Sequence, residues 1–146
     1  MEQNSLSRLV LAVDDHDEVR ATTARVLRQH GFTVLEAASG FQALTISLSV
    51  GRAPDLLITE VIMPDLDGLE LAGVLRRRYP LLPVLVTTGN LPDGAPKGDG
   101  RVLFLAKPYR PQDLIRCVRL LTQPCRGFGA GATPTGPCPQ ETPGVQ

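Results

Sequence analysis

Five short apolar runs constrain the fold of this chain more than any other feature. They lie at residues 9–13, 33–37, 55–59, 83–88 and 101–106. The run at 9–13 is apolar without polar alternation, which is typical of a strand covered on both faces. The intervening segments carry apolar residues mainly at helical spacing. Because right-handed crossovers leave few other topologies, this alternation predicts a parallel sheet with helices on both faces.

The segments between the runs predict helices with recognisable ends. Asp15 is placed to cap the first helix, and Gly31 is a stop signal at its end. A later helix from about 66 to 79 is expected to turn Val74 inward, together with neighbouring leucines. The last helix is expected at 111–122, with proline in its tolerated first turn.

Three segments depart from this regularity. Residues 89–100 contain two prolines and four glycines, so the helix expected between the fourth and fifth strands should be short or missing. We expect residues 1–6 to form a flexible N-terminus and 7–122 to form one domain. Residues 123–146 are rich in proline, glycine and small polar residues, which predicts a disordered tail.

Composition narrows the class of protein. The formal net charge is zero, and the only arginine cluster is 76–78, so neither a nucleic-acid groove nor binding to an anionic membrane is indicated. The three cysteines show no zinc-site spacing, and their odd number fits a reducing compartment. No apolar run approaches the roughly 20 residues that span a bilayer. We therefore expect a soluble, cytoplasmic protein.

Charged residues follow three of the predicted strands. Asp14 and Asp15 follow the first, Glu60 follows the third and Lys107 follows the fifth. In a parallel sheet these strand ends share the carboxyl edge, where open α/β sheets place their ligands. Carboxylates held close together repel one another and require a cation, which either Mg²⁺ or Lys107 can supply. The sequence therefore predicts an acidic pocket at this edge.

Four motifs in order give residues 7–122 a resemblance to the receiver domain of bacterial two-component response regulators. They are the Asp14-Asp15 pair, the Met-Pro-x-x-Asp-Gly run at 63–68, Thr88-Gly89 and Lys107-Pro108. The resemblance implies a flavodoxin-like (βα)5 fold, a doubly wound five-stranded parallel sheet. It also implies a signalling domain and not an enzyme.

The resemblance further implies roles for individual residues. Thr88 and Lys107 would bind phosphoryl oxygens, and Thr88 and Phe104 would act as switch residues. The acidic pair and the backbone carbonyl of Ile62 would hold Mg²⁺. The bond before Pro108 would be cis.

One position departs from the family pattern. The family's phosphoaccepting aspartate lies four residues before the Met-Pro proline, where this chain has Glu60. The longer side chain would displace the attacking oxygen by about 1 Å, which can cost about 10²-fold in rate. We therefore expect phosphorylation to be weak or absent. Glu60 would imitate part of the active state, and Mg²⁺ would bind weakly to Asp14, Asp15, Glu60 and Ile62.

Two alternatives remain open from the sequence. One is a conventional Mg²⁺-dependent, phosphoaccepting response regulator that uses Asp65 or Asp67. The other is a Mg²⁺-dependent phosphatase-like enzyme, with Asp14 nominally as nucleophile. The expected partners are proteins, either a sensor histidine kinase or a downstream signalling protein, and neither nucleic acid nor membrane. The oligomeric state is not predicted.

Overall fold

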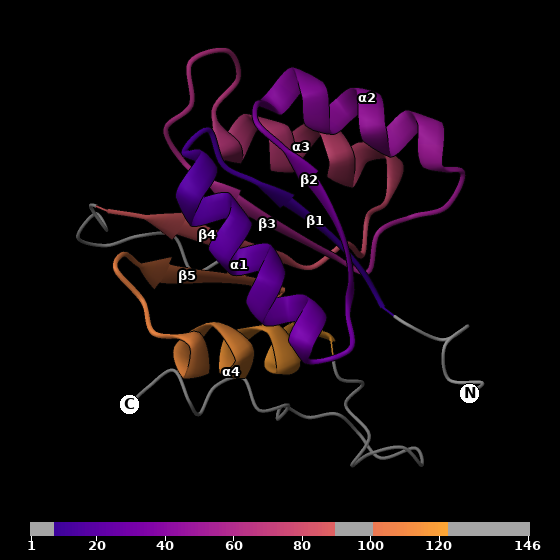
Figure 1. Ribbon diagram of the computed structural model, residues 1–146. Helices are drawn as coiled ribbons and strands as arrows, with labels where there is room; N and C mark the ends of the chain where they lie inside the picture. The colour runs from indigo at the N-terminus through magenta and orange to yellow at the C-terminus, as the bar shows by residue number, and fades with distance from the viewer. Residues whose placement is uncertain (1–7, 90–100, 123–146) are drawn as a thin grey trace, which may run out of the picture.

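One five-stranded parallel sheet organises the protein (Figure 1). The computed structural model describes residues 8–89 and 101–122. The strands are β1 (Leu9–Val13), β2 (Thr33–Ala37), β3 (Leu56–Glu60), β4 (Val84–Thr88) and β5 (Val102–Ala106). Their order across the sheet is β2-β1-β3-β4-β5, and every neighbouring pair is parallel. The predicted fold class, a doubly wound (βα)5 sheet, is confirmed.

Helices cover both faces of the sheet. They are α1 (Asp17–Gln29), α2 (Gly40–Val50), α3 (Gly68–Arg78) and α4 (Pro111–Thr122). Helices α1 and α4 pack on one face and α2 and α3 on the other, each pair over its own apolar cluster (Figure 1). Strands β1, β3 and β4 are buried along their whole length, whereas β5, at the edge of the sheet, is only half-buried. Burial on both faces explains the continuously apolar character of the central strands.

Two local predictions are wrong. Asp15 does not cap α1, because the N-cap is His16, which makes no side-chain capping bond. Val74 is 40% exposed, because α3 turns Leu71, Ala72 and Leu75 inward. At 100° per residue, Val74 lies roughly 100° from the middle of that buried stripe.

Some predictions fall outside the described residues. They are the flexible segment 1–6, the tail 123–146 and the short or missing helix between β4 and β5, which concerns residues 90–100. Within residues 8–89 and 101–122, no helix has the length and apolar character needed to cross a membrane.

The loop after β3 folds tightly back on the strand end. Asp67 caps α3 in a capping box, in which its carboxylate accepts the Glu70 amide and the Glu70 side chain accepts the Asp67 amide. The Gly68 amide donates to the Val61 carbonyl at 2.8 Å. A Cβ atom at Gly68 would lie 2.0 Å from the Glu60 carbonyl oxygen. Only glycine therefore permits α3 to begin this close to the end of β3.

Candidate functional site

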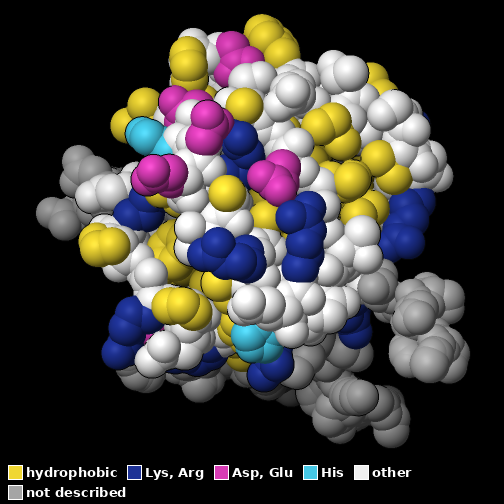
Figure 2. All heavy atoms as spheres, in the orientation of Figure 1, with side chains coloured by type: hydrophobic (Ala, Val, Ile, Leu, Met, Phe, Trp, Pro, Cys, Tyr) yellow, Lys and Arg dark blue, Asp and Glu magenta, His cyan; other side chains and the backbone are white. Residues whose placement is uncertain are grey.

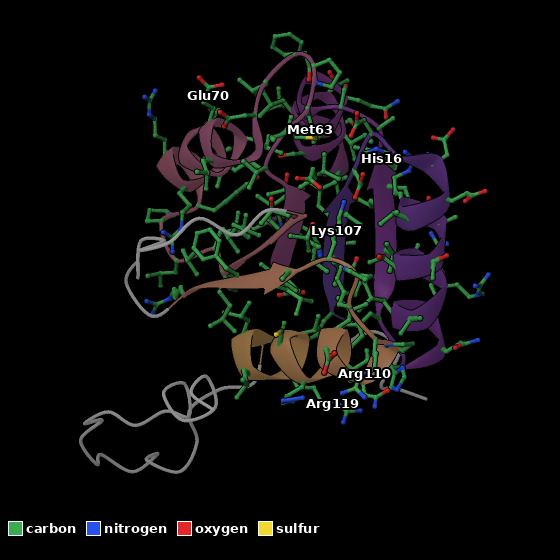
Figure 3. The ribbon with its side chains drawn as sticks, turned by 90° about the vertical axis from the view of Figure 1, so that its left-hand side faces the viewer. His16, Met63, Glu70, Lys107, Arg110 and Arg119 are labelled. Carbon is green, nitrogen blue, oxygen red and sulfur yellow. The ribbon has the colours of Figure 1, made fainter. Side chains whose placement is uncertain are left out.

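The register of the sheet brings the charged strand ends together. Facing pairs near the carboxyl edge are Val13 with Thr59, Glu60 with Thr87, and Thr88 with Ala106. Asp14 and Lys107 each follow directly after one of these strands. Lys107 lies at this edge in Figure 3, between the labelled His16 and Arg110. The side chains of Asp14, Glu60 and Lys107 consequently meet in one pocket.

Glu60 uses both of its carboxylate oxygens inside this pocket. Oε1 accepts a hydrogen bond from Lys107 Nζ at 2.5 Å. Oε2 accepts from the backbone amides of Val61 at 2.8 Å and Ile62 at 3.2 Å. The Glu60 side chain is only 7% exposed. The glutamate thus folds over its own strand end and holds the lysine.

Lys107 bridges Glu60 and Asp14. Its Nζ also donates to Asp14 Oδ2 at 3.0 Å, and its side chain is 16% exposed. Burial acts to lower the pKa of the ammonium, but the hydrogen bonds and charges of Glu60 and Asp14 outweigh this and raise the pKa of Lys107. The lysine is therefore charged at neutral pH, and it compensates one of the two buried carboxylates.

Two residues that sequence reasoning left without a role complete the surroundings of Asp14. Asp14 Oδ1 accepts from the His16 amide at 2.9 Å and lies 3.1 Å from His16 Nδ1. Arg20 Nη1 donates to the Asp14 carbonyl at 2.7 Å and Arg20 Nη2 to Asp17 at 2.8 Å. The available signals were weak: His16 directly follows the acidic pair, and Arg20 lies three residues after Asp17.

The acidic pair has the donor chemistry of a cation site. Carboxylate oxygens of Asp14 and Asp15 and a ring nitrogen of His16 lie within 4.8 Å of one another, a group that does not include Glu60. Asp15 Oδ1 is buried and has no hydrogen bond to any residue that the structure describes, and His16 Nδ1 is 3.5 Å from it. A buried carboxylate oxygen without a hydrogen bond is unfavourable. Binding of Mg²⁺, which prefers hard oxygen ligands, would remove this cost, so the chemistry of the acidic pair fits Mg²⁺. Glu60 would first have to leave Lys107 or the backbone amides.

The other predicted site residues surround the end of β5. Thr88 is buried, and its carbonyl accepts the Lys107 amide at 2.8 Å. Phe104 is half-buried against the apolar cluster under α2 and α3. The Lys107–Pro108 peptide bond is cis.

A tyrosine missed by sequence reasoning ties the loop after β5 to α1. The Tyr109 hydroxyl is 2.8 Å from Thr23 Oγ1, and burial raises the pKa of Tyr109. No sequence pattern indicated that the two hydroxyl groups would meet.

Asp65 and Asp67, the two acids of the loop after β3, accept hydrogen bonds from backbone amides at the starts of helices. Asp65 accepts the backbone amides of Phe41 at 2.9 Å and Gly40 at 3.2 Å, at the start of α2. The amide of Phe41, together with those of Leu66 and Gly40, lowers the pKa of Asp65. Asp67 caps α3. Among the described residues, the Lys107 ammonium donates to Asp14 and Glu60, and neither Asp65 nor Asp67 is a partner of it.

A doubly wound sheet with an acidic pair and a lysine at its carboxyl edge defines a receiver-type signalling domain. The family model of the response regulator receiver domain matches residues 10–119. The chain belongs to this family, whose domains serve two-component signalling.

Named relatives agree with this assignment. Sensor kinase CckA of Brucella abortus (strain 2308) is 35% identical over 116 residues, which cover 77% of this chain and 12% of the kinase. Response regulator MprA of Mycobacterium ulcerans (strain Agy99) is 36% identical over 119 residues, covering 80% of this chain and 50% of that protein. The chain therefore spans half or less of these two relatives.

Solved structures show the same fold. The receiver domain of the hybrid histidine kinase CckA superimposes with a TM-score of 0.66 at 39% identity, covering 79% of this chain and 99% of that one. Chemotaxis protein CheY4 of Vibrio cholerae superimposes with a TM-score of 0.71 at 29% identity, covering 79% and 98%.

Proposed function

We propose that this receiver domain signals through protein contact without a phosphorylation cycle at the end of β3. In the family pattern, Glu60 stands at the phosphoacceptor position. The observation that carries the proposal is that both Glu60 oxygens are already engaged, one by Lys107 and one by two backbone amides. A carboxylate that attacks a phosphodonor must offer a free lone pair in line with phosphorus.

Turning an oxygen of Glu60 in line with a phosphodonor is costly. Oε1 keeps a second lone pair beyond its bond to Lys107, but reorienting the carboxylate would break at least one of its bonds, each of which contributes about 1.5–3 kcal/mol because the group is charged. The additional methylene group displaces the attacking oxygen by about 1 Å, with a cost of about 10²-fold. Lys107, which would bind phosphoryl oxygens in the family, is held by Glu60 and Asp14. The lost hydrogen bond, the displaced oxygen and the occupied lysine all slow phosphorylation at Glu60.

Glu60 also places a permanent negative charge beside Lys107. That charge is about −1, compared with −1.5 to −2 for a phosphoryl group, so it imitates the modified state only in part. Thr88 and Phe104 would then remain the switch residues. Mg²⁺ would bind weakly, through Asp14 and Asp15 with Glu60 and the Ile62 carbonyl.

The partner in this proposal is a protein, either a sensor histidine kinase or a downstream signalling protein. Among the relatives, one is a sensor kinase and another a response regulator. No observation favours a conventional phosphoacceptor at Asp65 or Asp67, because both carboxylates accept backbone amides at helix starts. The phosphatase-like alternative likewise gains no support, because both Asp14 oxygens are hydrogen-bonded.

The test is incubation with acetyl phosphate and Mg²⁺, followed by intact-mass measurement of the wild type and Glu60→Asp. We expect no stoichiometric adduct on the wild type and an adduct on the aspartate variant. A stoichiometric wild-type adduct would overturn the proposal, and peptide mapping would show whether Glu60, Asp65 or Asp67 carried it. Failure of both proteins to react would show that Glu60 is not what blocks the reaction.

A further inference from the structure

A groove on the surface of α4 lies apart from the strand-end pocket. Its volume is about 580 Å³, and His30, at the end of α1, contributes to one side. The buried Ile115 and half-buried Leu120 form its apolar floor, while the exposed Arg116 and Arg119 stand at its rim. Figure 3 shows Arg119 on the side of α4 that faces away from the sheet.

The cations on this rim are incompletely neutralised. Arg119 has no ion pair or hydrogen bond within the described part of the chain. Among residues 8–89 and 101–122, Arg116 pairs only with Asp113, at 3.2 Å, and its side chain remains 61% exposed. His30 Nδ1 donates to the Val26 carbonyl at 2.9 Å, so Nε2 of the neutral ring is an acceptor. The donors that the rim offers to an anionic group are therefore the guanidinium groups of Arg116 and Arg119.

Charge is segregated along α1, although the whole chain has zero net charge. The first turn of α1 carries Asp17 and Glu18, next to the acidic pair, with Arg20 bound to Asp17. The later turns carry Arg25 and Arg28 and no acid, and Arg28 is paired with Glu36 of β2 at 3.1 Å. In Figure 2 the Asp and Glu side chains gather in the upper part of this face, and Lys and Arg predominate below them. An acidic partner is thus attracted to the α4 half and repelled from the strand-end edge.

We propose that the groove docks an acidic amphipathic helix of a partner protein. Apolar side chains of that helix would cover Ile115 and Leu120, and its carboxylates would meet Arg116 and Arg119. These arginines are three residues apart on α4, a rise of about 4.5 Å, so carboxylates one turn apart on a docked helix match them. This inference rests on the proposed function, because it names the surface and partner chemistry of the protein contact.

The probe is a fluorescein-labelled peptide of about 15 residues, long enough to form a helix. It has leucines at i, i+3, i+4 and i+7 and flanking glutamates. Binding is measured by anisotropy at low salt and mapped by amide NMR. We expect saturable binding with shifts centred on 115–120 and His30. The same peptide with lysine in place of glutamate should not bind.

Matched variants separate docking from general electrostatics. The double variant Arg116→Glu and Arg119→Glu should weaken binding at least about 10-fold, because it replaces two attractions with two repulsions. The double variant Arg77→Glu and Arg78→Glu makes the same total charge change at two exposed positions on α3 and should change affinity less than about 2-fold. Equal losses in both variants, or shifts centred elsewhere, would overturn the assignment.

Two other occupants are separate outcomes of this experiment. Tighter binding of a single-stranded oligonucleotide of equal charge would replace the protein partner with a nucleic acid. Concentration-dependent shifts of the same amides without peptide would indicate a second copy of the chain. Either outcome overturns the proposal. The acetyl phosphate assay does not involve α4. Absence of peptide binding at the groove would therefore leave the proposal for Glu60 unchanged, and phosphorylation of the wild type would leave the peptide-binding result unchanged.

Discussion

Replacing Lys107 with methionine removes the cation that holds the strand-end pocket together. The variant leaves the carboxylates of Asp14 and Glu60, each 7% exposed, without their shared ammonium group. Removing one partner of a buried ion pair costs about 3–5 kcal/mol. We expect the lower end, about 3 kcal/mol, because Lys107 is 16% exposed and both carboxylates keep their bonds to backbone amides. Since whole domains are stable by about 5–15 kcal/mol, this loss is large.

Urea unfolding at pH 7 measures the free energy of unfolding of wild type and Lys107→Met, and thermal unfolding should show a melting temperature lower by about 10 °C. Adding Glu60→Gln to Lys107→Met should recover about 1–2 kcal/mol, because one uncompensated buried charge disappears. The reasoning is refuted if Lys107→Met costs less than about 1 kcal/mol, or if the second substitution adds its own full loss.

The pH dependence follows from the raised pKa of Lys107. The stabilisation by its charge is fully present below the ordinary lysine value of 10.5 and is lost as pH rises through the higher pKa of the folded state. The difference in unfolding free energy between wild type and Lys107→Met should therefore stay constant from pH 7 to pH 10 and shrink only above 10.5. A difference that declines between pH 7 and pH 9 would contradict this assignment.

Three further substitutions, with Gly73→Ala as a control, test the supporting structure, each by urea unfolding. Gly68→Ala should lower the free energy of unfolding by about 3 kcal/mol or more, because its Cβ would lie 2.0 Å from a backbone carbonyl oxygen. The control Gly73→Ala, whose Cβ would have nothing within 4 Å, should stabilise the protein by about 0.5–1 kcal/mol. Similar effects of the two substitutions would refute the close approach at Gly68. Asp65→Asn should destabilise the protein at pH 7. The difference in unfolding free energy from wild type should fade as pH falls below the ordinary aspartate value of 3.8, because folding lowers the pKa of Asp65. A difference that stays constant down to pH 2 would contradict this prediction. Tyr109→Phe should cost about 1 kcal/mol through the lost bond to Thr23, and no loss would mean that the hydroxyl pair contributes nothing.

The sequence predicted the sheet well because burial on both faces leaves a strong signal. The run at 9–13 coincides with β1, and the other strands begin within about one residue of expectation. Strand order was less accessible, because the crossover rule fixes handedness and not which strands become neighbours. The inward face of α3 was misjudged at Val74, where an apolar side chain is exposed. A single exposed apolar residue on a helix is common and gives no warning.

The site was predictable as a set of residues but not as a set of bonds. Strand ends placed Asp14, Glu60 and Lys107 together, since parallel strands share one edge. The pairing of Lys107 with both carboxylates depends on rotamers and distances of a few tenths of an ångström, which sequence spacing does not encode. The same limit hid His16 and Tyr109, whose contacts come from side-chain direction and not from a motif.

The methylene group that distinguishes glutamate from aspartate links these observations. It moves the carboxylate further from the strand, so that one oxygen of Glu60 turns back to the amides of Val61 and Ile62 while the other reaches Lys107. An aspartate at this position is shorter by one carbon–carbon bond, about 1.5 Å, and would have difficulty meeting both demands. Under the proposed function, Glu60 is therefore a structural ligand of the lysine at the position where an aspartate would offer an oxygen for attack. On this argument, Glu60→Asp should simultaneously free Lys107, weaken the pocket and restore reactivity towards acetyl phosphate.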